Sequence, residues 1–95
     1  MKPFFIKKPA DVTAVEGEEV EFLCKVGGDP LPHVTWRRRN DQVPIGRAQP
    51  INDRGLKFFE VLPEDAGVYV CEAENVVDKV TTHATLTVHG EAFRS

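Results

Sequence analysis

This 95-residue chain contains two cysteines, Cys24 and Cys71, and few chemical roles are open to a single pair of thiols. One pair of cysteines allows one intramolecular disulfide, and such a bridge persists in an oxidising compartment. Trp36 lies between them, and Tyr69 stands in a D-x-G-x-Y-x-C stretch at residues 65–71. This combination predicts a bridged core with a large aromatic ring beside it, rather than a nucleophilic site. Two buried thiols in a reducing compartment are the alternative.

Other residues that could perform catalysis are scattered. The only serine is Ser95, and the three histidines are His33, His83 and His89. His83 and His89 fall on the outward phase of one strand pattern, but two histidines do not supply the number of ligands that zinc requires. No C-x-x-C, phosphate-cradling glycine loop or nucleophile motif occurs. The sequence therefore predicts no enzyme, no metal site, no cofactor and no small-molecule substrate.

The run Arg37-Arg38-Arg39 is the one dense cluster of charge. Guanidinium groups bind sulfates in pairs of hydrogen bonds, so Arg37 and Arg39 are candidate contacts for heparan sulfate or another partner, while Arg38 would lay its stem along the sheet. Basic runs are more often merely solvated. Glu72 and Glu74 are expected to face the arginines from the neighbouring strand and to neutralise them. We therefore favour internal neutralisation over glycan binding.

Length and charge limit the remaining classes of function. A chain of 95 residues forms one domain, which we place at residues 3–89, with 1–2 as a linker or expression start and 90–95 as a linker or added tail. The formal net charge of −3 argues against a nucleic-acid partner. No apolar run reaches the length of a membrane span, and no signal peptide is recognisable. An extracellular protein with this sequence would be an excised module.

Apolar residues alternate with polar ones along most of the chain, which is the period of β-strands. Glycine and proline clusters separate the alternating segments. About eight short strands predict an all-β fold of two antiparallel sheets packed face to face. Pro50 places the weak strand at 47–51 at a sheet edge. The side chains expected in the structural core are Trp36, Leu56, Phe58, Tyr69 and Leu86.

The spacing of Cys24, Trp36 and Cys71, with Tyr69 two residues before the second cysteine, is typical of an immunoglobulin-like β-sandwich. In that fold, two Greek-key sheets are joined by one disulfide between them. Little room for extra strands remains between Trp36 and Leu56. The sequence therefore favours the compact intermediate set, or I-set, over the longer variable type.

The D-x-G corner at Asp65 predicts two further interactions. In I-set domains, an arginine that opens the fourth strand commonly pairs with this aspartate, and the matching position here is Arg47. The Tyr69 hydroxyl is expected to bond to the backbone near residues 62–65. Breaking a buried ion pair on one side only would be costly.

Several segments carry a closer resemblance. They are PFFIKKPADVT at 3–13, EG at 16–17, FLC at 22–24, GDPLPHVTWRR at 28–38, VPIGR at 43–47 and CEAEN at 71–75. Together they resemble an I-set domain of the Roundabout axon-guidance receptors, most of all the third immunoglobulin domain of that family. The chain departs from the family pattern at Asp78, where such domains usually carry a glycine in the last hairpin.

The resemblance implies an extracellular module of a single-pass plasma-membrane receptor for axon guidance or adhesion. The Roundabout family binds Slit ligands mainly through its first immunoglobulin domain, so this domain would act as a spacer, an orientation element or a protein contact. Protein partners would then be engaged through neighbouring domains. The alternative is an intracellular muscle or cytoskeletal module of the titin or palladin type, with reduced cysteines.

Overall fold

The computed structural model describes residues 1–39, 48–51 and 55–90, which form strands, turns and a short 3₁₀ helix. The elements are β1 (Phe4–Lys7), β2 (Val12–Val15), β3 (Val20–Phe22), β4 (Lys25–Gly27), β5 (His33–Arg38), β6 (Ala48–Ile51), β7 (Gly55–Phe58), η2 (Pro63–Asp65), β8 (Gly67–Glu74) and β9 (Lys79–His89). Within these ranges, no helix has the length and apolar character needed to cross a membrane. The predicted all-β fold is confirmed.

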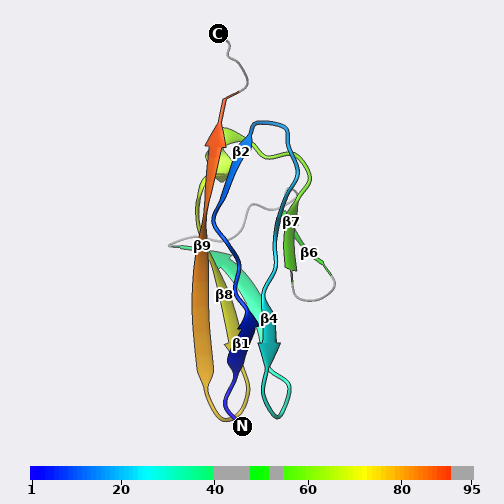
Figure 1. Ribbon diagram of the computed structural model, residues 1–95, viewed down its shortest axis with the longest axis vertical. Coiled ribbons are helices and arrows are strands. Elements are labelled where there is room, and N and C mark those ends of the chain that lie inside the picture. The colour runs from blue at the N-terminus through cyan, green and yellow to red at the C-terminus, as the bar shows by residue number, and fades with distance from the viewer. Residues whose placement is uncertain (40–47, 52–54, 91–95) are drawn as a thin grey trace.

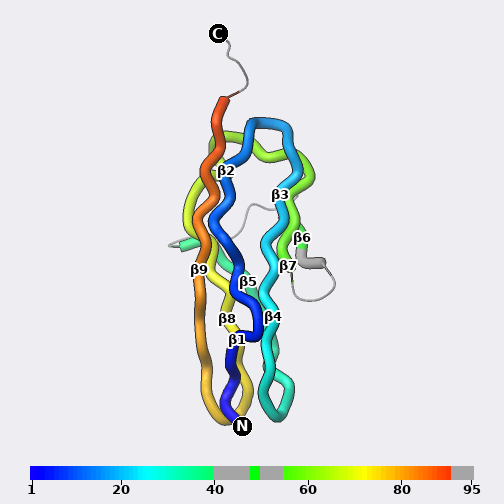
Figure 2. The backbone as a smooth tube through the Cα atoms, in the orientation of Figure 1, coloured from blue at the N-terminus to red at the C-terminus, as the bar shows by residue number. Residues whose placement is uncertain are grey.

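The strands form two layers (Figure 1). One layer is a four-stranded sheet in the order β2-β9-β8-β5, and the other holds the pair β1-β4 and the three-stranded sheet β3-β7-β6. The path of β3 continues into β4, so the two short sheets lie end to end (Figure 2). Cys24 and Cys71 join the layers through a disulfide with an S–S distance of 2.06 Å, which confirms the predicted bridge. The strand that contains Pro50, β6, lies at a sheet edge as expected.

One strand pairing corrects the prediction of two antiparallel sheets. The other pairings in the described part of the chain are antiparallel, but β2 runs parallel to β9, with residues 12–15 beside 86–89. The chain starts in one layer as β1 and crosses after Pro9 to the other layer, because proline lacks the N–H that would continue the first ladder. Since β2 keeps the direction of β1, it meets β9 in parallel. At the crossing, Asp11 Oδ1 accepts a hydrogen bond from the Thr85 N–H at 2.8 Å.

Aromatic side chains fill the space between the layers. The rings of Phe22, Phe58 and Tyr69 contact one another, with centroids 5.2 to 6.5 Å apart. Trp36 is partly buried, and it packs both against this group and against the residues around the disulfide. The indole therefore connects the two parts of the core. The predicted core residues that are fully or almost fully buried are Leu56, Phe58, Tyr69 and Leu86.

We expect Trp36→Ala to lower the free energy of unfolding by about 3–5 kcal/mol, as for other large aromatic truncations in cores. The substitution removes the ring that joins the two parts of the core. Denaturant unfolding of both proteins measures the difference. Phe59→Ala is the matched control, because Phe59 is 45% exposed, and its effect should stay below about 1 kcal/mol. An equally small effect of Trp36→Ala would mean that the indole is not packed beside the disulfide.

Candidate functional site

The corner between η2 and β8 is organised around the buried ring of Tyr69. The Tyr69 hydroxyl donates a hydrogen bond to the backbone carbonyl oxygen of Asp65 at 2.5 Å. Asp65 is itself buried, and its Oδ2 accepts a hydrogen bond from the Leu62 backbone N–H at 2.8 Å. The hydroxyl therefore reaches residues 62–65, the segment in which its partner was expected.

Arg38 braces the same corner from β5, where it lies opposite Tyr69 in the strand register. Its Nη2 donates hydrogen bonds to the carbonyl oxygens of Glu64 and Ala66, each at 2.6 Å. The guanidinium carbon lies 5.9 Å from the centroid of the Tyr69 ring. Gly67 has a φ of +151°, and a Cβ at that position would lie 3.1 Å from Arg38 Nε. Glycine at this position thus permits both the backbone conformation and the close passage of the arginine.

The predicted pairing of Asp65 with Arg47 stays a prediction, because Arg47 lies outside the described residues. The structure instead adds Arg38 to the corner, where sequence reasoning had placed only its stem along the sheet. Arg38 shares the phase of Val34 and Trp36, so strand phase indicates that its side chain is directed inward. The position of η2 within reach of the guanidinium is not contained in that phase.

We expect Arg38→Ala to lower the free energy of unfolding by about 1–3 kcal/mol, because it removes a charged donor from two carbonyl oxygens. Arg39→Ala is the matched control. Arg39 is exposed and points to the opposite side of the strand from Arg38. Its loss should therefore change the free energy of unfolding by about 0.5 kcal/mol or less. Denaturant titration of both variants gives the comparison. Equal effects of the two substitutions would show that Arg38 does not brace the corner.

The outward phase of β5 carries Arg37, and Glu72 on β8 neutralises it. Arg37 Nε lies 3.9 Å from Glu72 Oε1, and Glu72 Oε2 lies 3.9 Å from Lys79 Nζ on β9. One carboxylate is thus shared between cations on the strands at either side. Because the Arg37 and Lys79 side chains are about half exposed, each pair contributes at most about 1 kcal/mol. We call Arg37, Glu72 and Lys79 the charge cluster.

Other polar groups on this face do not assemble into a reactive site. Arg39 is exposed two residues beyond Arg37, and His83 and His89 are exposed on β9. Glu74, the second carboxylate expected to neutralise the arginines, lies opposite Lys79 in the register of β8 and β9. Among the described residues, no group of three or more histidine, cysteine, aspartate or glutamate side chains is placed to hold a metal ion. In the described part of this face, cations and carboxylates therefore lie beside one another on adjacent strands.

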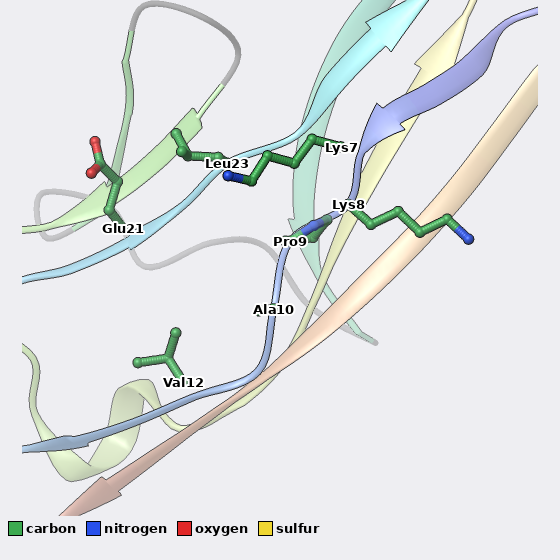
Figure 3. Close-up of a pocket in the computed structure, with 7 residues that line it drawn as sticks. All are labelled: Lys7, Lys8, Pro9, Ala10, Val12, Glu21 and Leu23. Atoms are coloured by element: carbon green, nitrogen blue, oxygen red, sulfur yellow. The ribbon is translucent and has the colours of Figure 1, made fainter.

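A shallow pocket of about 160 Å³ lies where the chain crosses between the layers (Figure 3). Lys7 extends across it toward Leu23, while Lys8 extends away from it. Pockets that bind small molecules usually enclose about 300–1,000 Å³, so this space is too small for a substrate site. The lining residues are Lys7, Lys8, Pro9, Ala10, Val12, Glu21 and Leu23.

Asn75 organises the end of the molecule that lies opposite the corner. Its Nδ2 donates hydrogen bonds to the carbonyl oxygens of Met1 and Pro30, both at 3.0 Å. Its Oδ1 accepts hydrogen bonds from the backbone N–H groups of Val77 at 2.9 Å and Asp78 at 3.1 Å. The hairpin is closed by the Asn75 N–H on the Asp78 carbonyl oxygen at 3.0 Å. Sequence reasoning recognised this hairpin but not the side chain that joins three segments.

The charge cluster allows a direct test of glycan binding. We expect the wild-type protein to pass through a heparin column at about 0.15 M salt, where screening is already short-ranged, because Glu72 holds Arg37. Glu72→Gln should increase retention, since it removes a negative charge and leaves two cations without their shared carboxylate. Glu21→Gln changes the net charge equally on the other layer and is the control.

The opposite result would assign the arginines to a glycan site. If the wild-type protein is retained and Arg37→Ala/Arg39→Ala is not, internal neutralisation is wrong. Retention at such a site should then weaken as the salt concentration rises.

The chain belongs to the immunoglobulin I-set family: the family model described as Immunoglobulin I-set domain matches residues 3–88. Two curated proteins are similar in sequence over nearly the whole chain. Roundabout homolog 1 of Homo sapiens is 39% identical over 87 residues, and Protein sax-3 of Caenorhabditis elegans is 43% identical over 88 residues. Each match covers 92% of this chain, but the chain spans only 5% and 7% of the two relatives.

A solved structure shares the fold closely. The crystal structure of the Titin M10-Obscurin like 1 Ig complex contains a chain that is 35% identical, with a TM-score of 0.86 and coverage of 97% of this chain and 98% of that chain. Immunoglobulin domains of this family are generally non-catalytic. The chain is thus similar both to domains of Roundabout proteins and to a domain in a titin complex.

Proposed function

We propose that this chain is a non-enzymatic extracellular module of a Roundabout-like axon-guidance or adhesion receptor, in which it acts as a spacer or protein-interaction domain. The observation that carries the proposal is the similarity to Roundabout homolog 1 and sax-3 across 92% of the chain. The bridge between Cys24 and Cys71 supports an oxidising compartment. The parent would be a single-pass plasma-membrane protein.

The shape of the domain supports the spacer role. Its principal extents are 52 × 22 × 19 Å, and Met1 and the end of β9 lie at opposite ends of the long axis (Figure 1). A module of this kind adds its full length to a string of domains. Ligands of the Slit type would be bound mainly by other domains of the parent. This module would set their distance and orientation, and the charge cluster would be a secondary contact for protein or heparan sulfate.

A second candidate function is supported by the structural comparison. Similarity to a chain of the titin M10 complex, at 35% identity over nearly the whole domain, favours an intracellular muscle or cytoskeletal module. In such a compartment the same two sulfurs would be kept as thiols. Both candidates are binding modules, and they differ in redox state and in location.

Free-thiol counting distinguishes the two candidates. The parent protein is taken from the cells that make it, blocked with an alkylating reagent during lysis, and unfolded before the thiols of this segment are counted by mass. We expect Cys24 and Cys71 to be unlabelled and joined to each other. Two alkylated cysteines would overturn the extracellular proposal and favour the titin-like alternative.

A variant without the disulfide gives a second test, on stability. Removing a native disulfide from a small domain typically costs about 2–5 kcal/mol. We expect Cys24→Ala/Cys71→Ala to lower the free energy of unfolding by an amount in that range. If the native domain instead holds two thiols, the wild-type protein should keep nearly all its free energy of unfolding in reducing buffer.

A further inference from the structure

Strand β9 is covered on one side along most of its length, but on the other side only near its end. It pairs with β8 from Lys79 to Leu86, whereas β2 lies beside residues 86–89 alone. In Figure 1, β2 accordingly runs beside the upper, red part of β9, and the lower, orange part stands at the margin of the molecule. Asp11 Oδ1 ends the covered part by accepting the Thr85 N–H at 2.8 Å. We call residues 79–84 the open edge of β9.

The bond to Thr85 shows which backbone groups the open edge presents. Successive N–H groups of a strand point to opposite sides, so those of Thr81 and His83 point away from β8, as the Thr85 N–H does. The Lys79 N–H points the same way and is held by Asp78 Oδ1 at 2.8 Å. Within the described part of the chain, the N–H and C=O groups of Thr81 and His83 bond to no strand or turn. A row of such groups is a template for one more strand.

Other strands at the margins of the sheets carry features that discourage pairing. Strand β1 is bounded by Pro3 and Pro9, and its ladder is irregular. On β2, Glu18 binds both backbone groups of Val15, through its Oε1 at 2.7 Å and its N–H at 3.0 Å. Strand β6 contains Pro50. Proline, bulges and capped ends are the means by which natural sheets protect their edges. The open edge of β9, by contrast, contains no proline and keeps a regular register with β8.

The charges around the open edge favour an acidic partner. Lys79 and His83 are exposed on its outer face. Lys8 belongs to the crossing between the layers, and its side chain extends from there toward β9 in Figure 3. The carboxylates of Glu72 and Glu74 stand on β8, one strand further from the edge, and Glu72 is already shared by two cations. Opposite charges on adjacent strands stabilise their pairing.

We propose that the open edge of β9 binds an extended, acidic segment of a protein partner as an additional strand of the four-stranded sheet. Backbone bonds to Thr81 and His83 give the affinity, and alternate acidic side chains lie on the outer face beside Lys79 and His83. The edge is about 20 Å long at the usual rise of a strand, so about six residues of the segment fit. The inference rests on the proposed role as a protein-interaction domain and not on the compartment.

The same charges disfavour a second copy of this chain as the occupant. Two copies joined along this edge would bring the Lys8 and Lys79 side chains of both to one joint, and like charges on adjacent strands are destabilising. A foreign acidic strand meets the same cations favourably.

Amide exchange of the isotope-labelled chain, followed by NMR, tests the open edge. In the free chain, the N–H groups of Thr81 and His83 should exchange at least about tenfold faster than those of Thr82 and Ala84, which point toward β8. The probe is a capped eight-residue peptide of alternating glutamate and valine. At about ten times its Kd, the Thr81 and His83 amides should exchange about tenfold more slowly, because binding leaves few of them open. The Thr82 and Ala84 amides should be unchanged.

Binding of the dye-labelled peptide, measured by fluorescence polarisation, provides matched controls. A fully N-methylated peptide has no N–H to donate and should bind at least about tenfold more weakly. Lys8→Ala/Lys79→Ala should weaken binding about threefold or more. Lys25→Ala/Lys57→Ala removes the same charge from the other layer and should not. Thr81→Pro removes an outward N–H without touching the ladder to β8 and should abolish binding, whereas Thr81→Val should preserve it.

Four results would overturn the proposal. Slow exchange of Thr81 and His83 in the free chain would show that the edge is already covered, and protection that is lost on dilution would assign the edge to a second copy. Equal affinity for the two peptides would show that backbone pairing is not used. No binding at about 1 mM peptide would leave only a negligible affinity. Free thiols at Cys24 and Cys71 would refute the extracellular function and leave this binding unchanged, whereas failure to bind would leave the receptor assignment standing.

Discussion

The contact between the two layers at the disulfide sets the geometry on which the rest of the structure depends. Cys24 and Cys71 hold the layers together, with their Cα atoms 6.7 Å apart. Strand β8 carries Cys71 together with Tyr69 and Glu72, and Asn75 directly follows it. Toward its start, Tyr69 organises the corner; one residue beyond the bridge, Glu72 neutralises the outer face; and just past its end, Asn75 joins the loops. A short domain buries only a modest fraction of its surface. Several of its stabilising contacts are therefore concentrated on and beside this central strand.

Much of the fold could be predicted from the sequence because it depends on local patterns. Alternation placed Leu56, Phe58 and Leu86 in the core, and the effect of proline on a ladder placed β6 at an edge. The contact between Arg37 and Glu72 also follows from strand phase, since both residues point outward from adjacent strands. Each of these features needs only a strand period and the identity of the neighbouring strand.

The remaining features depend on where distant segments meet, which no local pattern contains. The parallel pairing of β2 follows from a change of layer after Pro9, and the role of Arg38 depends on how closely η2 approaches β5. Asn75 is an ordinary hairpin asparagine in sequence, and its importance appears only when Met1 and Pro30 lie beside it. Side chains that bond to backbone carry little sequence signal, because any residue can supply the carbonyl oxygen.

The parallel pairing of β2 with β9 also determines how the domain bears mechanical tension. Residues 12–15 lie beside 86–89 through four residue pairs, and the chain enters and leaves at opposite ends of the long axis (Figure 1). A pull on the two ends therefore slides these strands along each other in shear. Under shear, all the hydrogen bonds of the ladder are strained together, whereas a hairpin pulled apart at its open end loses them one by one. A string of such domains would resist extension at the short β2–β9 ladder, which joins the first and last strands of the sheet.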